Sequence, residues 1–280
     1  MRCGLSIRTF YRDTLTCNYR EQIGVALRIR LRVNEELAMS HELHLQFRAS
    51  ADSPLDLEDH LAMVRRFTHI LGAEDALLGE SAWYLCGDTK GDSYRYPLFD
   101  GHGPAAAVLA VLRQEMAKDD VLKSFAIWNG RMESEKGASI WYYFDRADDA
   151  ASAWSLALVS KPPASRLGTW TTVARVLREA VKIWQPLLAT VDTRNYDGVF
   201  PDRPGAGWML YLPIILTEQH VPEAGAVIGV LDSNNKQLGT IVVSVTDGPF
   251  SGTNPEHIRS GHAIEVRLAD LGLLPRYIDL

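Results

Sequence analysis

Hydrophobic and polar residues alternate along several short stretches of the chain, which is the pattern of β-strands with one covered face. The stretch HELHLQF (41–47) places Leu43, Leu45 and Phe47 on one side and polar residues on the other. Three more such stretches follow one another, with charged turns between them, at 124–130, 138–146 and 153–161. Short connections between strands favour antiparallel pairing, so we expect these three to form a meander.

Apolar residues recur every three or four positions in other stretches, which predicts amphipathic helices. The first helix is marked by Ser53 and Pro54 at its start, by Asp56 in its first turn and by Gly72 as a stop. The other helices are expected at about 104–118, at 170–184 before Pro186, and from Asn254 and Pro255 onward. The last one is ambiguous, because IEVRL within it also alternates as a strand would.

The stretch GVFPDRPGAGWMLYLPI (198–214) combines rigid turn residues with an apolar, aromatic strand. Pro201 and Pro204 fix two backbone angles, and Gly205 and Gly207 permit conformations that residues with side chains resist. Large apolar residues occupy both sides of the strand that follows, so we expect one tightly packed face and a second face that is also partly covered. The pattern indicates a structural centre of the fold.

The order of the predicted elements defines the fold class. Strand, helix, strand and helix are followed by three strands, a helix, further strands with a hairpin around Asn234 and Asn235, and a final helix. Runs of strands joined by short turns favour an α+β fold with a largely antiparallel sheet and about four helices packed on it. The Pro-containing segment near 160–168 is a candidate hinge between two lobes.

Residues 1–38 differ from the rest of the chain in charge. They carry seven Arg against four acidic residues, whereas the remaining residues include 22 basic and 31 acidic ones. We interpret 1–38 as an atypical basic extension that precedes the domain 39–280; the alternative is a basic strand that pairs with the main sheet. The acidic remainder suits a basic partner and repels nucleic acid.

The overall composition is that of a globular protein, with 46% hydrophobic and 23% charged residues. No apolar run approaches the roughly 20 residues that cross a bilayer. No secretory signal is evident, so we expect a cytoplasmic protein. The three cysteines, Cys3, Cys17 and Cys86, are too few and too scattered to predict a disulfide framework or a zinc site.

The sequence contains none of the common catalytic or cofactor-binding motifs: no HExxH, no GxSxG, no Walker sequence and no dinucleotide fingerprint. His257 and His262 are five residues apart, whereas ligand pairs on a helix are three or four apart. Pairs of acidic residues fall in expected turns, where water solvates them, whereas catalytic carboxylates need enclosed surroundings that shift their pKa. We therefore expect no catalytic residue, no metal site and no cofactor.

Five stretches rich in Gly, Pro and aromatic residues resemble a known family: VFPDRPGAGWMLYLP (199–213), LGTIVVSVTDGPFSGTNPEHI (238–258), IEVRLADLGLLP (264–275), SAWYLCGDT and YPLFD. From about residue 40 to the end, the chain resembles immunity protein family 52 of bacterial polymorphic toxin systems. Members of that family are encoded beside toxins with a restriction-endonuclease-like nuclease domain, and several of these toxins are delivered by type VI secretion. The resemblance implies an inhibitor, not an enzyme, that neutralises such a nuclease and protects the producing cell and its kin. Residues 1–38 do not match the family's pattern.

The loop 88–100 and two charged turns, 129–137 and 145–149, combine acidic with aromatic residues, as recognition loops often do. A nuclease binds the phosphate groups of its substrate with cationic groups, so its active-site surface is positive and attracts an acidic partner. We expect the aromatic residues to act as anchors and the acidic residues as complementary charges. The expected partner-binding residues are Asp88, Asp92, Tyr94, Tyr96, Trp128, Glu133 and Glu135.

Trp141 and Tyr143 occupy the second face of an expected strand, and a face turned to water does not usually carry such residues. Either a helix covers this face or another molecule docks there.

Two other functions remain open at the level of the sequence. One is an enzyme or small-molecule binder with a pocket between the two halves, near Trp170, Trp184 and Trp208. The other is an adaptor that carries a secreted effector without inhibiting it.

Overall fold

The computed structural model describes residues 39–48, 55–87, 89–117, 122–131, 133, 135–145, 152–160, 164–193 and 195–280. Nine strands form one sheet: β1 (Met39–Phe47), β2 (Tyr84–Leu85), β5 (Leu122–Trp128), β6 (Ala138–Asp145), β7 (Ser152–Ser160), β8 (Leu188–Thr193), β9 (Met209–Leu212), β10 (Ala226–Leu231) and β11 (Gln237–Val243). Their order across the sheet is β10-β11-β9-β8-β1-β7-β6-β5-β2, and all neighbours are antiparallel. A second, small sheet pairs β3 (Phe99–Asp100) with β4 (Gly103–Pro104).

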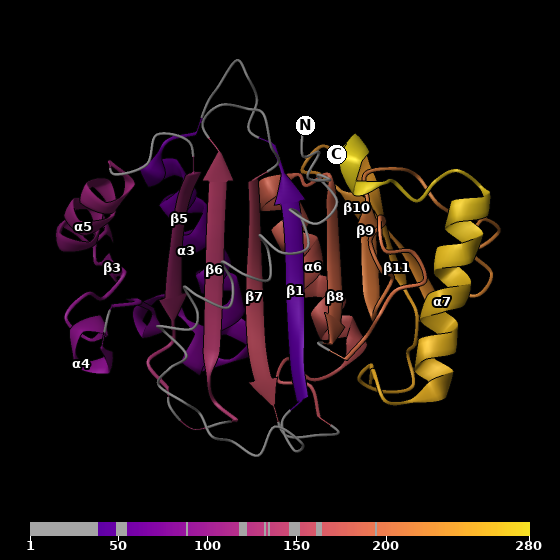
Figure 1. Ribbon diagram of the computed structural model, residues 1–280, viewed down its shortest axis with the longest axis horizontal. Helices are drawn as coiled ribbons and strands as arrows, with labels where there is room; N and C mark the ends of the chain where they lie inside the picture. Colours follow the sequence, from indigo (N-terminus) through magenta and orange to yellow (C-terminus); the bar gives the residue numbers. More distant parts are fainter. Residues whose placement is uncertain are drawn as a thin grey trace, which may run out of the picture.

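The α-helices of the described residues are α3 (Leu57–Glu74), α4 (Lys90–Ser93), α5 (Ala106–Met116), α6 (Trp170–Trp184) and α7 (Pro255–Asp270), and the 3₁₀ turns are η2 (Ala76–Leu78), η3 (Glu80–Ala82) and η4 (Tyr277–Asp279). Figure 1 shows α3 and α6 behind the sheet, α4 and α5 at one end of it and α7 at the other. The α+β class, the largely antiparallel sheet and the four longer helices are confirmed. The ambiguous C-terminal element is a helix, because Asn254 caps it and Pro255 occupies its first turn.

Strand β1 lies in the middle of the sheet although it comes first among the described elements. It pairs with β7 from Met39 to Phe47 and with β8 from His41 to Gln46. One sheet therefore contains strands from both sides of the segment near 160–168. The division into two lobes at this segment stays a prediction.

The start and end of α3 differ from the sequence prediction. Asp56 and Asp59 form a capping box, in which each side chain accepts the other residue's backbone N–H (2.9 and 3.0 Å). Asp56 is therefore the N-cap and not a first-turn residue, while Ser53 and Pro54 lie outside the described residues. Gly72 does not end the helix, because α3 continues to Glu74. A Cβ on Gly72 would lie 2.7 Å from the Cα of Gly79, so this glycine serves close packing.

The apolar stretch SAWYLCG (81–87) predicts a short buried strand. Strand β2 is shorter than this stretch: Tyr84 and Leu85 pair with β5, whereas Ser81 and Ala82 belong to the 3₁₀ turn η3.

The main hydrophobic core fills the space between the sheet and the helices α3 and α6, and a buried polar network crosses it. The indole N–H of Trp184 donates to the hydroxyl of Tyr142 at 3.0 Å. That hydroxyl is then free to donate to Nδ1 of His60, which lies 2.9 Å away. Burial lowers the pKa of His60 to about 4, so the imidazole is a neutral acceptor at physiological pH. The network joins α3, β6 and α6.

Helix α7 packs on the opposite face of the sheet. Met209 and Tyr211 of β9 belong to the main core, whereas the alternate residues Leu210 and Leu212 belong to a second cluster with Ile264 of α7. Because side chains alternate between faces along a strand, α7 must cover the side of β9 that faces away from α3 and α6. Both faces of this strand are covered, as the sequence predicted.

The stretch 198–207 is folded around the carboxylate of Glu265, which is 1% exposed on α7. Its Oε2 accepts the backbone N–H of Val199 (2.6 Å), and its Oε1 accepts that of Ala206 (2.8 Å) and the hydroxyl of Tyr196. Burial, followed by the nearby charge of Glu265, raises the pKa of Tyr196. A buried carboxylate is tolerated when its oxygens accept hydrogen bonds in this way. The Gly- and Pro-rich stretch and the C-terminal helix thus meet at one acid.

None of the helices in the described ranges is both long and apolar enough to cross a membrane. The basic segment 1–38, including the alternative of an additional strand within it, lies outside those ranges.

Candidate partner-binding site

Three aromatic residues gather at the β2 edge of the sheet. The ring of Tyr94, just after α4, lies 5.4 Å from Trp128 of β5 and 5.2 Å from Tyr84 of β2 (centroid distances). The hydroxyl of Tyr94 donates to the carbonyl of Gly130 at 2.7 Å, which ties the loop after β2 to the turn after β5. Tyr94 is 41% exposed although its ring is held on two sides. The structure therefore brings together two of the predicted anchors, Tyr94 and Trp128, in a fixed geometry.

The turn at Gly130 depends on the absence of a side chain. Gly130 has φ +67°, and a Cβ there would lie 2.9 Å from the ring of Tyr84. Any other residue would be strained and would push the aromatic rings apart.

Three of the predicted acidic residues lie on the segments that carry this aromatic group: Asp92 on α4 just before Tyr94, and Glu133 and Glu135 in the turn after β5. Asp92 accepts a hydrogen bond from the hydroxyl of Thr89 (2.6 Å) and lies 3.5 Å from a guanidinium nitrogen of Arg95. Glu133, which is exposed, lies 3.9 Å from Nζ of Lys136. Exposed ion pairs of this kind are weak, so the carboxylates can exchange partners. We call the surface formed by Tyr84, Asp92, Tyr94, Trp128, Glu133 and Glu135 the acidic-aromatic edge.

One of the predicted site residues, Tyr96, is not part of that surface. Tyr96 packs against the main core, and its carbonyl accepts the backbone N–H of Leu85 at 3.0 Å. Asp88 lies outside the described residues, as do 146–149 of the turn 145–149. Tyr84, by contrast, was missed by the sequence analysis because it lies in the stretch predicted as a buried strand.

Trp141 and Tyr143 of β6 lie on the same face of the sheet as Trp128. The strand register pairs Trp141 with Ala126 of β5. Ala126 and Trp128 are two residues apart on β5, so their side chains lie on the same face of the sheet. The rings of Trp141 and Tyr143 are nearly parallel (5°) with centroids 6.1 Å apart. In the part of the chain that the structure describes, no helix covers this face over β5, β6, β7 and β1 (Figure 1).

A cluster of charged groups lies further across the same face. Glu42 of β1 is the direct cross-strand neighbour of Asp192 of β8. Nε2 of His44 lies 3.3 Å from a carboxylate oxygen of Glu42 and 3.9 Å from one of Asp192. Burial raises the pKa of Asp192 to about 6, an effect that His44 opposes and the charges of Glu42 and Glu265 reinforce.

The residues named for the rival enzyme pocket fill the core instead of lining a cavity. Trp184 is 4% exposed, Trp208 is fully buried, and the indole N–H of each is hydrogen-bonded, to Tyr142 and to the carbonyl of Val245 respectively. Trp170 is half-buried and packs against the main core.

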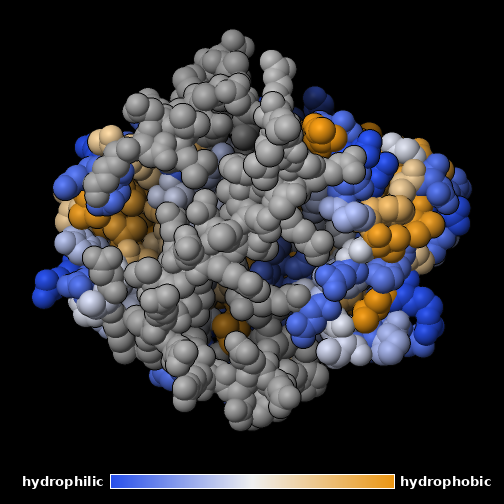
Figure 2. Space-filling model, viewed as in Figure 1, coloured by the Kyte–Doolittle hydropathy of each residue, from blue (hydrophilic) through white to orange (hydrophobic). Residues whose placement is uncertain are grey.

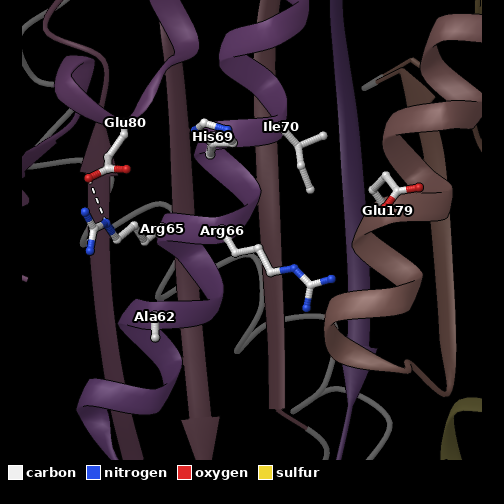
Figure 3. A pocket seen from close by; sticks show the side chains of 7 residues that line it. All are labelled: Ala62, Arg65, Arg66, His69, Ile70, Glu80 and Glu179. Atoms are coloured by element: carbon white, nitrogen blue, oxygen red, sulfur yellow. Dashed lines mark hydrogen bonds and ion pairs between the residues drawn. The ribbon is translucent and has the colours of Figure 1, made fainter. Parts of the chain in front are cut away.

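A hollow of about 490 Å³ lies elsewhere, on the outer side of α3 (Figure 3). Its lining residues are Ala62, Arg65, Arg66, His69, Ile70, Glu80 and Glu179. Arg65 is paired with Glu80 at 2.7 Å, and Figure 3 shows Arg66 turned away from Arg65 towards α6. The two guanidinium groups do not converge on one point, as an anion site would require.

Within the described ranges, no three His, Cys, Asp or Glu side chains are placed to share a metal ion.

The apolar surface around α7 is broken into small patches, which Figure 2 shows beside polar residues. Ile215 (65% exposed) and Leu271 (47% exposed) are among the exposed apolar residues. Scattered residues of this kind are ordinary on a globular protein.

Comparison with known proteins decides the family. The sequence model of immunity protein 52 matches residues 58–276. The chain belongs to the immunity protein 52 family. Membership of this family implies a cognate toxin as the partner and inhibition of that toxin as the role. The predicted family is thereby confirmed.

The solved structures include a similar chain, the Pseudomonas aeruginosa T6SS protein PA0821. It is 11% identical with a TM-score of 0.48, and the alignment covers 87% of this chain and 82% of that chain. No curated protein matches this immunity protein.

Proposed function

We propose that this immunity protein binds and neutralises a nuclease-type toxin in the cytoplasm and so protects the producing cell and its kin. The observation that carries the proposal is the family match over residues 58–276. We further propose that the system is a polymorphic toxin system whose toxin carries a restriction-endonuclease-like domain and is delivered by type VI secretion. The resemblance of the stretches 199–213 and 238–258 to the family supports this extension.

The charge of the chain fits a nuclease as partner. From residue 39 to the end there are 31 acidic residues against 22 basic ones. A nuclease must present cations to the phosphates of its substrate, and an acidic protein is steered towards such a surface. Electrostatic steering raises the association rate more than it raises the affinity.

The acidic-aromatic edge is the surface that we propose for the first contact with the toxin. Tyr94 and Trp128 are held in place before binding, by ring contacts and by the hydrogen bond of Tyr94 to Gly130. Anchors that are already ordered lose little conformational entropy when a partner docks. In this proposal Asp92, Glu133 and Glu135, together with Asp88, supply the complementary charges, while Tyr96 supports the loop from beneath.

Inhibition of the purified toxin tests the proposal. We expect nuclease activity to fall linearly with added immunity protein and to reach zero near one equivalent, without consumption of the inhibitor. Binding without inhibition would contradict the proposal and indicate an adaptor. An increase of inhibition with time at substoichiometric amounts would indicate an enzyme.

Charge reversal tests the proposed edge. One variant changes four acids to Lys: Asp88, Asp92, Glu133 and Glu135. The matched control makes the same change in charge at exposed acids on α7 and the loops near it: Glu218, Asp247, Glu256 and Asp270. We expect the first variant to associate about tenfold more slowly than the control at low salt, with a difference that shrinks as salt is added. Equal dissociation constants for both variants at low salt would remove the edge from the interface.

A further inference from the structure

Strand β10 (Ala226–Leu231) is the last strand of the sheet at the end where α7 lies (Figure 1). It pairs with β11 on one side, and no strand of the described ranges pairs with its other side. The edge of a sheet presents backbone N–H and C=O groups that can pair with a further strand. The natural ligand of such an edge is therefore another β-strand.

The backbone groups of β10 that face away from β11 belong to Val227, Gly229 and Leu231. Across the hairpin, the N–H of Asp232 donates to the carbonyl of Lys236 at 2.9 Å, so the backbone of Asp232 faces β11. Backbone groups alternate in direction along an antiparallel strand. Leu231, and then every second residue back along β10, consequently direct their N–H and C=O groups outward.

Strand β10 has neither a charged residue nor a Pro, although natural edge strands commonly carry them as protection against pairing. Its sequence is AVIGVL, in which Gly229 is exposed and Leu231 is 42% exposed. Its register with β11 is continuous from Ala226 to Val230 and shifts before Leu231. An incoming strand thus meets an uncharged, regularly paired edge over most of its length.

The two faces of β10 are covered differently. Ala226, Ile228 and Val230 pack in or against the main core, whereas Val227 packs against the second cluster beneath α7. Side chains alternate between faces along a strand, so the exposed Leu231 lies on the same face as Val227.

Two copies of β10 are complementary when they pair antiparallel about a two-fold axis at Gly229. The axis is perpendicular to the sheet, so the α7 face of each copy stays on the same side of the joined sheet. Leu231 of one copy then lies opposite Val227 of the other, and the two Gly229 residues face each other. The outward N–H and C=O groups of these three residues bond to those of the other copy, and each exposed Leu231 gains an apolar neighbour.

Charge and position favour a second copy over the toxin as the occupant of this edge. The described domain is acidic, with 31 acidic against 22 basic residues from residue 39 onward, and the proposed toxin surface is basic. β10 offers no carboxylate to a basic surface, whereas two acidic copies repel each other least where they carry no charge. The acidic-aromatic edge lies at the opposite end of the nine-stranded order, eight spacings of about 4.8 Å away, so pairing at β10 leaves it accessible.

We propose that two copies of this immunity protein associate through β10, as an antiparallel strand pair centred on Gly229 that continues the sheet from one copy into the other. The dimer presents its two acidic-aromatic edges at opposite ends. The pairing does not depend on the proposed function, and its failure leaves that function intact.

Sedimentation velocity of the full-length protein measures the association. Because one strand pair is a small interface, we expect monomers at about 1 μM and dimers at about 100 μM. Leu231→Lys should weaken the dimer about tenfold or more, because a charge on an edge strand opposes pairing. The matched control, Leu271→Lys, makes the same change at the C-terminal end of α7, where Leu271 is 47% exposed, and should dimerise like the unsubstituted protein.

Two variants of Gly229 test the position of the axis. A Cβ at Gly229 would lie 3.1 Å from the side-chain amide nitrogen of Gln237, and the end of this flexible side chain can move aside. Gly229→Lys and Gly229→Asp each place like charges opposite each other across the axis, so each variant alone should stay monomeric. An equimolar mixture of the two should dimerise, which also shows that both variants are folded.

Three results overturn the inference. They are a protein that stays monomeric at about 100 μM, a dimer that Leu231→Lys leaves intact, and a mixture of the two Gly229 variants that stays monomeric. If the protein is monomeric and Leu231→Lys weakens toxin binding, the edge binds a strand of the toxin and not a second copy. Inhibition of the toxin by Leu231→Lys at one equivalent separates a failure of dimerisation from a failure of the proposed function.

Discussion

Replacing Glu265 by Ala removes a buried carboxylate that accepts three hydrogen bonds from the stretch 196–206. The side chain is 1% exposed, so little water can take its place without opening the contact between α7 and this stretch. We expect the substitution to lower the free energy of unfolding substantially, because donors that are satisfied in the native protein lose their acceptor.

The magnitude follows from the surroundings of each donor. Ala206 is 2% exposed, so its N–H would be left buried without an acceptor, at a cost of about 1–3 kcal/mol. The partly buried hydroxyl of Tyr196 adds a similar or smaller cost. Val199 is 39% exposed, and water can reach its N–H. With the cavity left by the side chain, we expect a loss of about 3–5 kcal/mol.

Urea unfolding at pH 7.5 measures this loss. The matched control is Glu256→Ala on the same helix, whose side chain is 75% exposed and paired with Arg259, and it should cost less than about 1 kcal/mol. Glu265→Gln keeps one carbonyl oxygen as an acceptor, so it should fall between the two. If Glu265→Ala and Glu256→Ala unfold at the same urea concentration, Glu265 does not organise this part of the fold.

Two further predictions concern two buried histidines and two glycines. Burial lowers the pKa of both His41 and His60 from 6.5 to about 4, so the unfolded state binds more protons in this window and stability falls as pH drops from 6.5 towards 4. Each histidine should lower the free energy of unfolding by about 2 kcal/mol at pH 5 relative to pH 7.5, while Asp192 has the opposite effect. In urea unfolding, His60→Phe should lose about 2 kcal/mol less than the unsubstituted protein between these two pH values. An equal loss in both proteins would contradict the assignment. Gly207→Ala should cost more than about 2 kcal/mol, because φ is +49° and the new Cβ would lie 2.5 Å from the Cβ of Asp192. Gly272→Ala, with φ +69° and no atom within 4 Å, isolates the backbone effect at about 1 kcal/mol, and equal thermal shifts for the two would refute the steric reasoning.

Periodicity predicted the elements whose partners are near in sequence. The meander of β5, β6 and β7 and the hairpin of β10 and β11 follow from alternation and turn residues, which act locally. The position of β1 between β7 and β8 could not be predicted, because it depends on pairing with strands more than 100 residues away. The alternation of apolar and polar residues indicates that a strand has a covered face, but it does not indicate which strand lies beside it.

The same limit applies to the candidate site. Tyr94 and Trp128 were chosen from their residue types and loop positions, and the structure places them in contact. Tyr84 was missed because it lies in a stretch that was predicted to be a buried strand, and nothing in the local sequence indicates that its ring contacts Tyr94. The juxtaposition of Glu42 and Asp192 required the register of β1 with β8, which no local pattern contains.

We propose that this immunity protein acts by binding a toxin. Growth of cells that produce the cognate toxin, with and without co-expression of the immunity protein, tests this most directly. We expect co-expression to restore growth, and the restored cells to yield a complex of the two proteins in equal amounts. Growth arrest that persists although the immunity protein is present in excess and folded would contradict it.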